Sequence, residues 1–394
     1  MQNNLDTPVY LTNAGASGPL PEMMVDSGQT TCNFYAKGSA IALPAKGSCK
    51  LTYSSKIPTL PDNISQKTYL DTVFVTSQIG YTARYTEVGV KVNQQSRVYI
   101  TGDSQEIRMC DLNPISGKFI NCVNANSTMA YPGVHSDAIV LSPDGKHAYI
   151  ADTQLGNGKV YSCSIDQTTG KFTSCPNSGA TPTGSQTNPE SIALTNNGTR
   201  ISIVYGDNTV TTCRVDNVTG LFSQCLDASP NPSTFSAVFT IAYSPDGKYA
   251  YVGGSRSSAT IYSCKVNQAT GKFTSCNNFT PPAFFTYTPT NISLTNYGTR
   301  AGITNGNAFV TTCSINNATG NFSQCIKTDG NPKPFTVVDS MVYTPDGKYA
   351  DVIDMSVPNK IYVCNVNQVT GEFNNCTDLD IKFSNRFKHL AFTN

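Results

Sequence analysis

Residues 139–175 contain the unit that decides the fold, IVLSPDGKHAYIADTQLGNGKVYSCSIDQTTGKFTSC. Two turn signals, Pro143-Asp144-Gly145 and Thr169-Gly170, each separate two runs rich in β-branched and aromatic residues. Glycine supplies the positive φ that a tight hairpin turn needs. The stretch therefore predicts two consecutive β-hairpins, with four short strands A to D, and it shows no helical periodicity.

Six pairs of cysteines mark repeats of this unit along the chain. The two cysteines of each pair lie 12 residues apart, and the first cysteines of successive pairs are separated by 53, 50, 51, 49 and 51 residues. The pairs are Cys110/Cys122, Cys163/Cys175, Cys213/Cys225, Cys264/Cys276, Cys313/Cys325 and Cys364/Cys376. A four-stranded unit repeated about every 50 residues predicts an all-β fold, a β-propeller, with an open solenoid as the alternative.

The number of blades follows from an alternation between repeats. The repeats of Cys163, Cys264 and Cys364 carry Pro-Asp-Gly-Lys, whereas those of Cys213 and Cys313 carry Leu-Thr-Asn-x-Gly-Thr-Arg. The duplicated unit is thus two blades long, and three such units predict six blades.

The end of the chain predicts how the ring closes. Leu390–Asn394 resembles a strand A and is expected to complete the first blade, which favours six blades. If Val88–Val92 were the first blade's own strand A, the terminal strand would instead begin a seventh blade.

The cysteine spacing also predicts disulfides. In a hairpin whose turn lies midway between them, the two cysteines face each other, at a Cα distance of about 4.5 Å that suits a disulfide. Short spacings typical of zinc sites are absent from the sequence. We expect six disulfides within blades and a seventh between Cys32 and Cys49; the alternative is buried free thiols. Disulfides indicate a secreted, periplasmic or cell-surface protein. The first residues contain no leader pattern, so we expect that a signal peptide has been removed.

Composition excludes several classes of function. The chain has 27 Lys+Arg against 26 Asp+Glu, a formal net charge of +1, so nucleic acid is not an expected partner. Charged residues make up 13%, about half the usual share, which is typical of β proteins with Ser, Thr and Asn surfaces. No apolar run approaches the roughly 18–20 residues that span a bilayer, so the mature chain is expected to be soluble.

The repeat resembles a known family. The strands around Ser-Pro-Asp-Gly-Lys-x-Ala-Tyr-Val, followed by Val-Tyr-x-Cys-x-Ile-Asp-x-x-Thr-Gly-Lys-Phe, are similar to the YVTN/lactonase-type β-propeller repeats of bacteria over residues 87–394. The paired cysteines depart from the plain repeat. Residues 1–86 are expected to form a small β-rich module that resembles immunoglobulin-like domains of bacterial surface proteins. The resemblance implies either a lactonase or a surface or periplasmic binding protein.

Candidate chemistry gathers where strand A begins. Asp137, Glu190 and Asp339 occupy equivalent positions at the expected channel mouth, and Lys388 and Thr290 hold that position in two other blades. Three carboxylates could bind a hard cation such as Ca²⁺, or one could act as a general base; alternatively they cap loop amides or are solvated.

The histidines and a search for known motifs give little further indication of a catalytic site. His135 and His389 lie near the same mouth and are weak catalytic candidates, whereas His147 aligns with Tyr249 and Tyr349 and is expected to be structural. No nucleophile elbow, P-loop, zinc-protease, dinucleotide or EF-hand motif is present, so no cofactor is predicted.

The loops between strand D and the next strand A carry aromatic residues. These are candidates for a recognition surface, or else they pack between blades. The candidates are Tyr131, Phe239, Phe284, Phe285, Tyr287 and Phe335.

Two classes of function remain. The favoured hypothesis is a secreted or periplasmic binding protein, more an interaction module than an enzyme, that holds a protein or other extracellular ligand on the rim of these loops. The alternative is a lactonase-type or metal-dependent propeller hydrolase with carboxylates and His at the channel mouth. The sequence makes no prediction of the oligomeric state.

The disulfide pattern is directly testable. Peptide mapping without reduction should recover Cys163–Cys175 and its five equivalents, together with Cys32–Cys49, because constant local spacing leaves each cysteine one nearby partner. Disulfides between blades would contradict the predicted strand register. Alkylation of all cysteines without prior reduction would contradict the predicted oxidising compartment.

Overall fold

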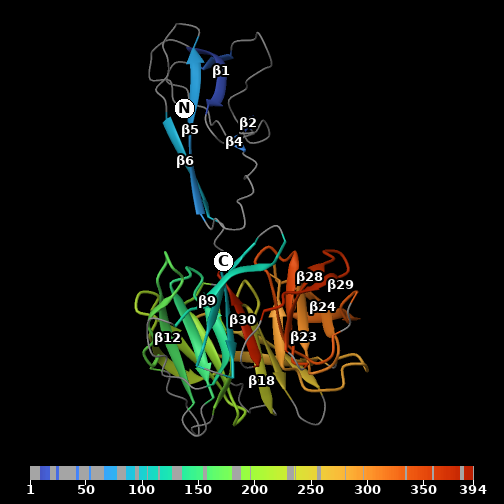
Figure 1. Ribbon diagram of the computed structural model, residues 1–394. Coiled ribbons are helices and arrows are strands. Elements are labelled where there is room, and N and C mark those ends of the chain that lie inside the picture. The colour runs from blue at the N-terminus through green and yellow to red at the C-terminus, as the bar shows by residue number, and fades with distance from the viewer. Residues whose placement is uncertain are drawn as a thin grey trace. The chain divides into compact units, whose positions relative to one another are not determined.

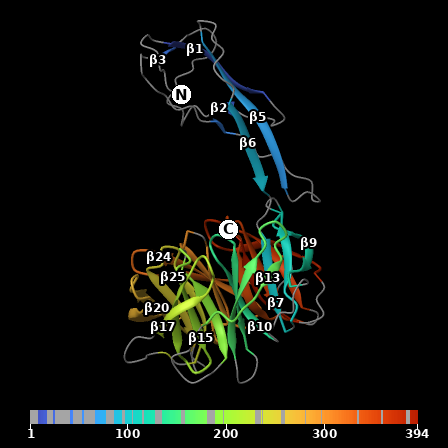
Figure 2. The ribbon, with the colours of Figure 1, turned by 90° about the vertical axis from the view of Figure 1, so that its left-hand side faces the viewer.

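The computed structural model describes the chain in two units, Met1–Gln95 and Ser96–Asn394 (Figures 1 and 2). In the first unit it describes only the backbone of the strands. In the second it describes residues 97–393 except 104, 114–115, 127–134, 154–157, 180–187, 196, 229–234, 236, 255–258, 280, 296, 333–334, 357–358 and 382–385. No helix of the described residues is long and apolar enough to cross a membrane.

The first unit contains two small sheets. One has the strand order β3 (Ile41–Leu43), β1 (Val9–Ser17), β5 (Gln66–Ser77), β6 (Thr86–Asn93), and the other pairs β2 (Met24–Val25) with β4 (Tyr53–Ser54). Because β6 pairs with β5, the segment 88–92 is not a strand of the ring, and the division lies after Gln95 rather than after residue 86. Cys32 and Cys49 lie outside the described residues, and the immunoglobulin-like resemblance stays a prediction.

The second unit is a propeller of six four-stranded blades. From strand A outward to strand D, the blades are β30 (Phe387–Phe392), β7 (Arg97–Gly102), β8 (Arg108–Leu112), β9 (Phe119–Asn124); β10 (Ser136–Leu141), β11 (His147–Asp152), β12 (Lys159–Ile165), β13 (Phe172–Ser174); β14 (Pro189–Leu194), β15 (Arg200–Tyr205), β16 (Val210–Val215), β17 (Phe222–Asp227); β18 (Val238–Tyr243), β19 (Tyr249–Gly254), β20 (Thr260–Val266), β21 (Phe273–Phe279); β22 (Asn291–Leu294), β23 (Arg300–Thr304), β24 (Val310–Asn316), β25 (Asn321–Thr328); and β26 (Val338–Tyr343), β27 (Tyr349–Asp354), β28 (Lys360–Val366), β29 (Phe373–Asp378).

The ring closes through the last strand of the chain. The six strands A contact one another all the way round, with β30 between β26 and β10. β30 pairs antiparallel with β7, so that Leu390 lies opposite Ile100 and Ala391 opposite Tyr99. Figure 1 shows the red β30 within the ring. The six-bladed prediction and the structural role of the terminal strand are confirmed.

Each hairpin of strands C and D carries one disulfide. In all six the Cα atoms are 4.0 Å apart and the sequence separation is 12 residues. The bonds join Cys110 to Cys122, Cys163 to Cys175, Cys213 to Cys225, Cys264 to Cys276, Cys313 to Cys325, and Cys364 to Cys376. The six predicted disulfides within blades are confirmed, and each lies in the packing between neighbouring blades.

The register around these disulfides differs from the prediction in four blades. Cys264 and Cys276 lie directly opposite each other, and the register of their hairpin shifts only after Lys265. In the four blades with a different register, two residues of strand D lie opposite the single strand C cysteine, which is a β-bulge. The strand D cysteines at these bulges are Cys122, Cys225, Cys325 and Cys376, and each follows an Asn or Gln with positive φ. The two cysteines still face each other as predicted, at a Cα distance of 4.0 Å. The position of the extra residue is what spacing alone does not reveal.

The two cysteines of a disulfide differ in burial. The strand C cysteine is fully buried in every blade, as at Cys110 and Cys264. Among the strand D cysteines, Cys175 and Cys376 are also buried. The remaining four, Cys122, Cys225, Cys276 and Cys325, are only partly buried. Each disulfide thus connects the core between two blades to the outer strand of one of them.

The turn of that hairpin packs against the preceding blade. Gly320, at φ +72°, lies so close to the Tyr249 ring that a Cβ there would overlap it. Tyr249 donates a hydrogen bond of 2.7 Å from its hydroxyl to the carbonyl oxygen of Ala318 in the same turn. His147 stands in the same place against Gly220, and it is buried, which confirms that it is structural. Glycine is thus required both for backbone geometry and for close approach.

A pair of substitutions separates these two requirements. Gly347 also has a positive φ of +68°, but nothing lies within 4 Å of a Cβ placed there. Gly347→Ala should lower the free energy of unfolding by roughly 1–2 kcal/mol, because alanine is strained in the left-handed backbone conformation. Gly320→Ala should cost about 1–3 kcal/mol more, because the added methyl group displaces Tyr249. Equal losses of unfolding free energy in denaturant titrations would contradict the docking of the turn.

Candidate functional site

The mouth of the channel is formed by one residue from the start of each strand A. Strands that begin at the same depth in six blades place equivalent side chains around one opening. In ring order these are Lys388, Asp137, Glu190, Phe239, Thr290 and Asp339, and all six line a cavity of about 290 Å³. The structure therefore brings together the three predicted carboxylates with Lys388 and Thr290.

Lys388 lies between two of the carboxylates. Its blade separates the blades of Asp339 and Asp137, and its Nζ is 3.7 Å from Oδ1 of Asp137. The same Nζ is 3.5 Å from Oδ1 of Asp103, which follows β7. The other carboxylate oxygen of Asp137 accepts a hydrogen bond from the hydroxyl of Thr153. Lys388 and Asp137 are thereby fixed relative to each other.

The electrostatics of this group single out Asp339. Burial raises the pKa of Asp339 above its usual range; Lys388 lowers it, and Asp137 and Asp103 raise it further. Burial would lower the pKa of Lys388, but the carboxylates of Asp137, Asp103 and Asp339 outweigh this and raise it. Lys388 therefore stays charged, while Asp339 titrates nearer neutrality than an exposed carboxyl, as suits a general base.

The backbone of Asp339 is held by two threonines of the neighbouring blade. Its carbonyl oxygen accepts hydrogen bonds of 2.6 Å from the hydroxyls of both Thr290 and Thr304. The start of β26 is thus fixed from across the blade interface, and the Asp339 side chain is held at the channel mouth.

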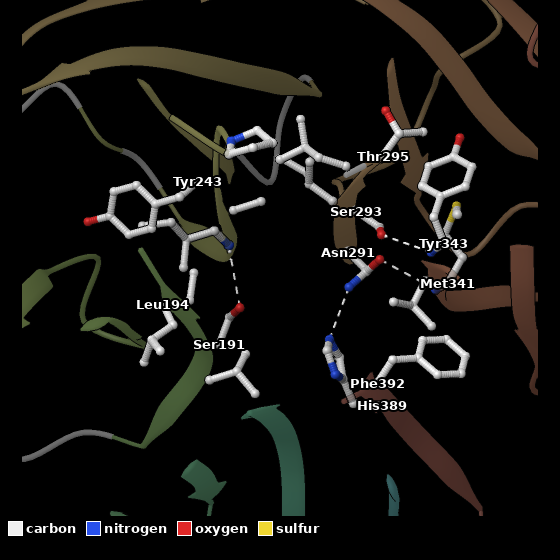
Figure 3. Close-up of a pocket in the computed structure, with 18 of the residues that line it drawn as sticks. Ser191, Leu194, Tyr243, Asn291, Ser293, Thr295, Met341, Tyr343, His389 and Phe392 are labelled. Carbon is white, nitrogen blue, oxygen red and sulfur yellow. Dashed lines mark hydrogen bonds between the residues drawn. The ribbon is translucent and has the colours of Figure 1, made fainter. Parts of the chain in front are cut away.

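His389 and Asn291 meet one layer below the mouth. Figure 3 shows the Asn291 amide pointing toward the His389 ring, with Nδ2 and Nε2 3.1 Å apart. Asn291 Oδ1 accepts from the backbone N–H of Met341, so Nδ2 faces the imidazole as a donor and Nε2 must accept. Burial lowers the pKa of His389 to about 4. Its ring is neutral at physiological pH, and the Nε2 lone pair is already engaged.

A second cavity of about 300 Å³ lies toward the turns between strands A and B (Figure 3). Its wall mixes apolar residues such as Leu194 and Phe392 with polar ones such as Ser293 and Thr295. Ser191, Asn291 and His389 line both cavities, so this layer separates the two chambers of the channel.

The carboxylates do not form a cation site. Among the described residues, no three His, Cys, Asp or Glu side chains are grouped so that they could hold a metal ion. The Ca²⁺ site considered for Asp137, Glu190 and Asp339 is therefore not formed, because the Lys388 ammonium lies between Asp339 and Asp137 and neutralises part of their charge.

The loop aromatics divide between packing and exposure. Phe285 and Phe335 are 5% and 3% exposed, so they are part of the core and cannot contact a partner. Phe284 lies edge-on to Phe309, and Phe239 lines the channel mouth. Tyr287 is 62% exposed. The predicted aromatic recognition surface is thus wrong for Phe285 and Phe335, whose rings fill gaps between strands.

Two predicted residues lie elsewhere. Tyr131 is outside the described residues. His135 precedes β10 with an exposed side chain and does not line either described cavity.

Sequence reasoning missed Asp103 and Asn291. Asp103 lies just after strand B, where the repeat varies, and no pattern points to it. Asn291 directly follows Thr290, so counting one residue further along strand A would have found it.

Comparison with known families finds one match to the repeat. The family described as "Lactonase, 7-bladed beta-propeller" matches residues 124–339, more than half of the chain. The described residues of this chain form six blades rather than the seven of that description. A search of the curated proteins finds no match.

Solved structures share the fold at low sequence identity. The periplasmic gluconolactonase PpgL of Pseudomonas aeruginosa is 15% identical, with 85% of this chain and 97% of that chain covered and a TM-score of 0.51. A Bacteroides fragilis protein, provisionally named a 6-phosphogluconolactonase, is 15% identical, with 76% and 98% covered and a TM-score of 0.54. TolB from Acinetobacter baumannii is 12% identical, with 82% and 79% covered and a TM-score of 0.52. At these identities the likeness concerns the fold alone.

The low pKa of His389 makes stability depend on pH. Between pH about 4 and 6.5 the unfolded chain binds a proton at this residue and the folded chain does not. The free energy of unfolding should therefore rise with pH across that window, by about 3 kcal/mol in total. His389→Gln should remove this slope, whereas His135→Gln, at an exposed position, should not. A His389 midpoint near 6.5 by NMR would contradict its burial.

Proposed function

The chain belongs to the family described as Lactonase, 7-bladed beta-propeller, and we propose that it hydrolyses a small sugar lactone at the mouth of its channel. The observation that carries the proposal is the placement of Asp339, with a raised pKa, beside the charged Lys388 in a cavity of about 290 Å³. A general base and a fixed cation are the two groups that lactone opening needs.

In the proposed reaction, Asp339 acts as general base. Its carboxylate takes a proton from a water molecule as the water oxygen bonds to the lactone carbonyl carbon. The Lys388 ammonium stabilises the negative charge that develops on the carbonyl oxygen. The ring C–O bond then breaks, the leaving alkoxide takes up a proton from Asp339, and the product is an open-chain acid that ionises.

The size of the cavity limits the substrate. Small-molecule sites typically measure about 300–1,000 Å³, and this cavity lies at the lower limit of that range. It suits a single sugar ring rather than a chain of sugars. The polar residues of the mouth, such as Glu190 and Thr290, offer hydrogen bonds to ring hydroxyls.

The lactonase hypothesis is better supported than a binding role. Burial of Phe285 and Phe335 removes two anchors of the predicted recognition surface. Tyr287 is exposed, but one ring gives only a small contact area for a partner. A protein or other extracellular ligand on the loop rim stays a prediction. We further propose that the protein acts outside the cytoplasm, since the six disulfides of the described blades need an oxidising compartment to form.

Removal of the proposed base tests the activity. Asp339→Asn should lower kcat/KM for glucono-1,5-lactone by about 10²-fold or more, measured as acid release above the spontaneous rate. Asp329→Asn is the matched control, because Asp329 is exposed on the loop that precedes the same strand. Equal activity of the two variants would refute the role of Asp339.

The pH profile tests the pair. Because Asp339 must be ionised, kcat/KM should rise with pH through its pKa, which lies above that of an exposed Asp. Lys388 lowers this pKa, so Lys388→Met should move the acid limb to higher pH as well as reduce the rate. An acid limb that stays in place would show that the two side chains do not interact.

A further inference from the structure

The charge of the channel mouth sets which lactones it can accept. We propose that the site takes an uncharged polyhydroxy lactone and rejects one that carries a phosphate or another anionic group. This inference rests on the proposed function and adds the substrate class to it.

Among the described side chains that line the mouth, the acidic ones outnumber the basic ones. Asp137, Glu190 and Asp339 face the cavity, and Lys388 is the one cation among the lining residues that the structure describes. Its Nζ is 3.7 Å from Asp137 and 3.5 Å from Asp103, so this single cation is outnumbered by the carboxylates around it. The His389 ring below is neutral. A ligand therefore meets excess negative charge.

Recognition of a phosphate needs a different set of groups. Anion sites use arginine forks, several lysines or the N-terminus of a helix. The described lining residues include no Arg, and the described part of the ring is built from strands without a helix. A phosphate placed here would face carboxylates in a confined cavity, where charges are screened less than in water.

An uncharged lactone finds complementary partners in the same cavity. Carboxylates accept hydrogen bonds from sugar hydroxyls, and Glu190 and Asp137 lie on neighbouring strands of the wall. Thr288 and Phe239 complete a wall with polar and apolar residues.

The same charge favours release of the product. Hydrolysis adds water to the lactone and yields an aldonic acid, which loses a proton and becomes a carboxylate. The neutral substrate is thus converted into an anion inside an acidic cavity. Repulsion by the carboxylates of the mouth shortens its stay, so product inhibition by the aldonate should be weak.

The test compares two substrates of the full chain that differ only in the phosphate. We expect kcat/KM for glucono-1,5-lactone to exceed that for 6-phosphoglucono-1,5-lactone by at least about tenfold at low salt, and this ratio to fall as NaCl is added. An equal or higher value for the phosphorylated lactone would overturn this inference and leave the lactonase function standing. Failure to hydrolyse either lactone above the spontaneous rate would refute the proposed function, and with it this inference.

A charge-matched pair of variants locates the effect. Glu190→Gln should lower the ratio of the two kcat/KM values by about threefold or more, because it removes one negative charge from the mouth. Glu372→Gln removes the same charge from an exposed turn between strands C and D and should leave the ratio unchanged. An equal change in both variants would show that net charge, and not the channel mouth, sets the preference.

Discussion

The pairing of β30 with β7 is the constraint on which the rest of the molecule depends. It joins the last residues of the chain to the first strand of the ring, with Leu390 opposite Ile100, and so leaves no strand A missing from the six described blades. The same strand carries Lys388 and His389 into the channel. The strand that closes the ring therefore also completes the candidate site.

Contacts between neighbouring blades make the closed ring rigid. Each hairpin of strands C and D is fixed by a disulfide and places its turn glycine against strand B of the preceding blade, as Gly320 lies against Tyr249. Such close contacts leave little room for other side chains at the turns, whereas the residues at the start of strand A face a cavity. The scaffold is thus repeated in every blade, and the chemistry varies at one position in each.

The repeat made much of this predictable. Equivalent spacing identified the disulfides, the role of Leu390–Asn394 and the shared position of Asp137, Glu190 and Asp339, because backbone geometry repeats with the sequence. Spacing does not reveal bulges such as the one at Cys122, nor side-chain contacts between blades. The ion pair of Lys388 with Asp103 joins residues 285 positions apart. The burial of Phe285 likewise depends on how neighbouring strands pack. The sequence does not show this packing, so the prediction that Phe285 contacts a partner was wrong.

Complementation tests most directly whether closure of the ring builds the site. The chain would be truncated after residue 385 and mixed with a synthetic peptide of residues 386–394. The account predicts that the peptide restores cooperative unfolding and hydrolysis of glucono-1,5-lactone together, and that a Lys388→Met peptide restores the fold with little activity. A truncated chain that hydrolyses the lactone at the full rate without any peptide would contradict it.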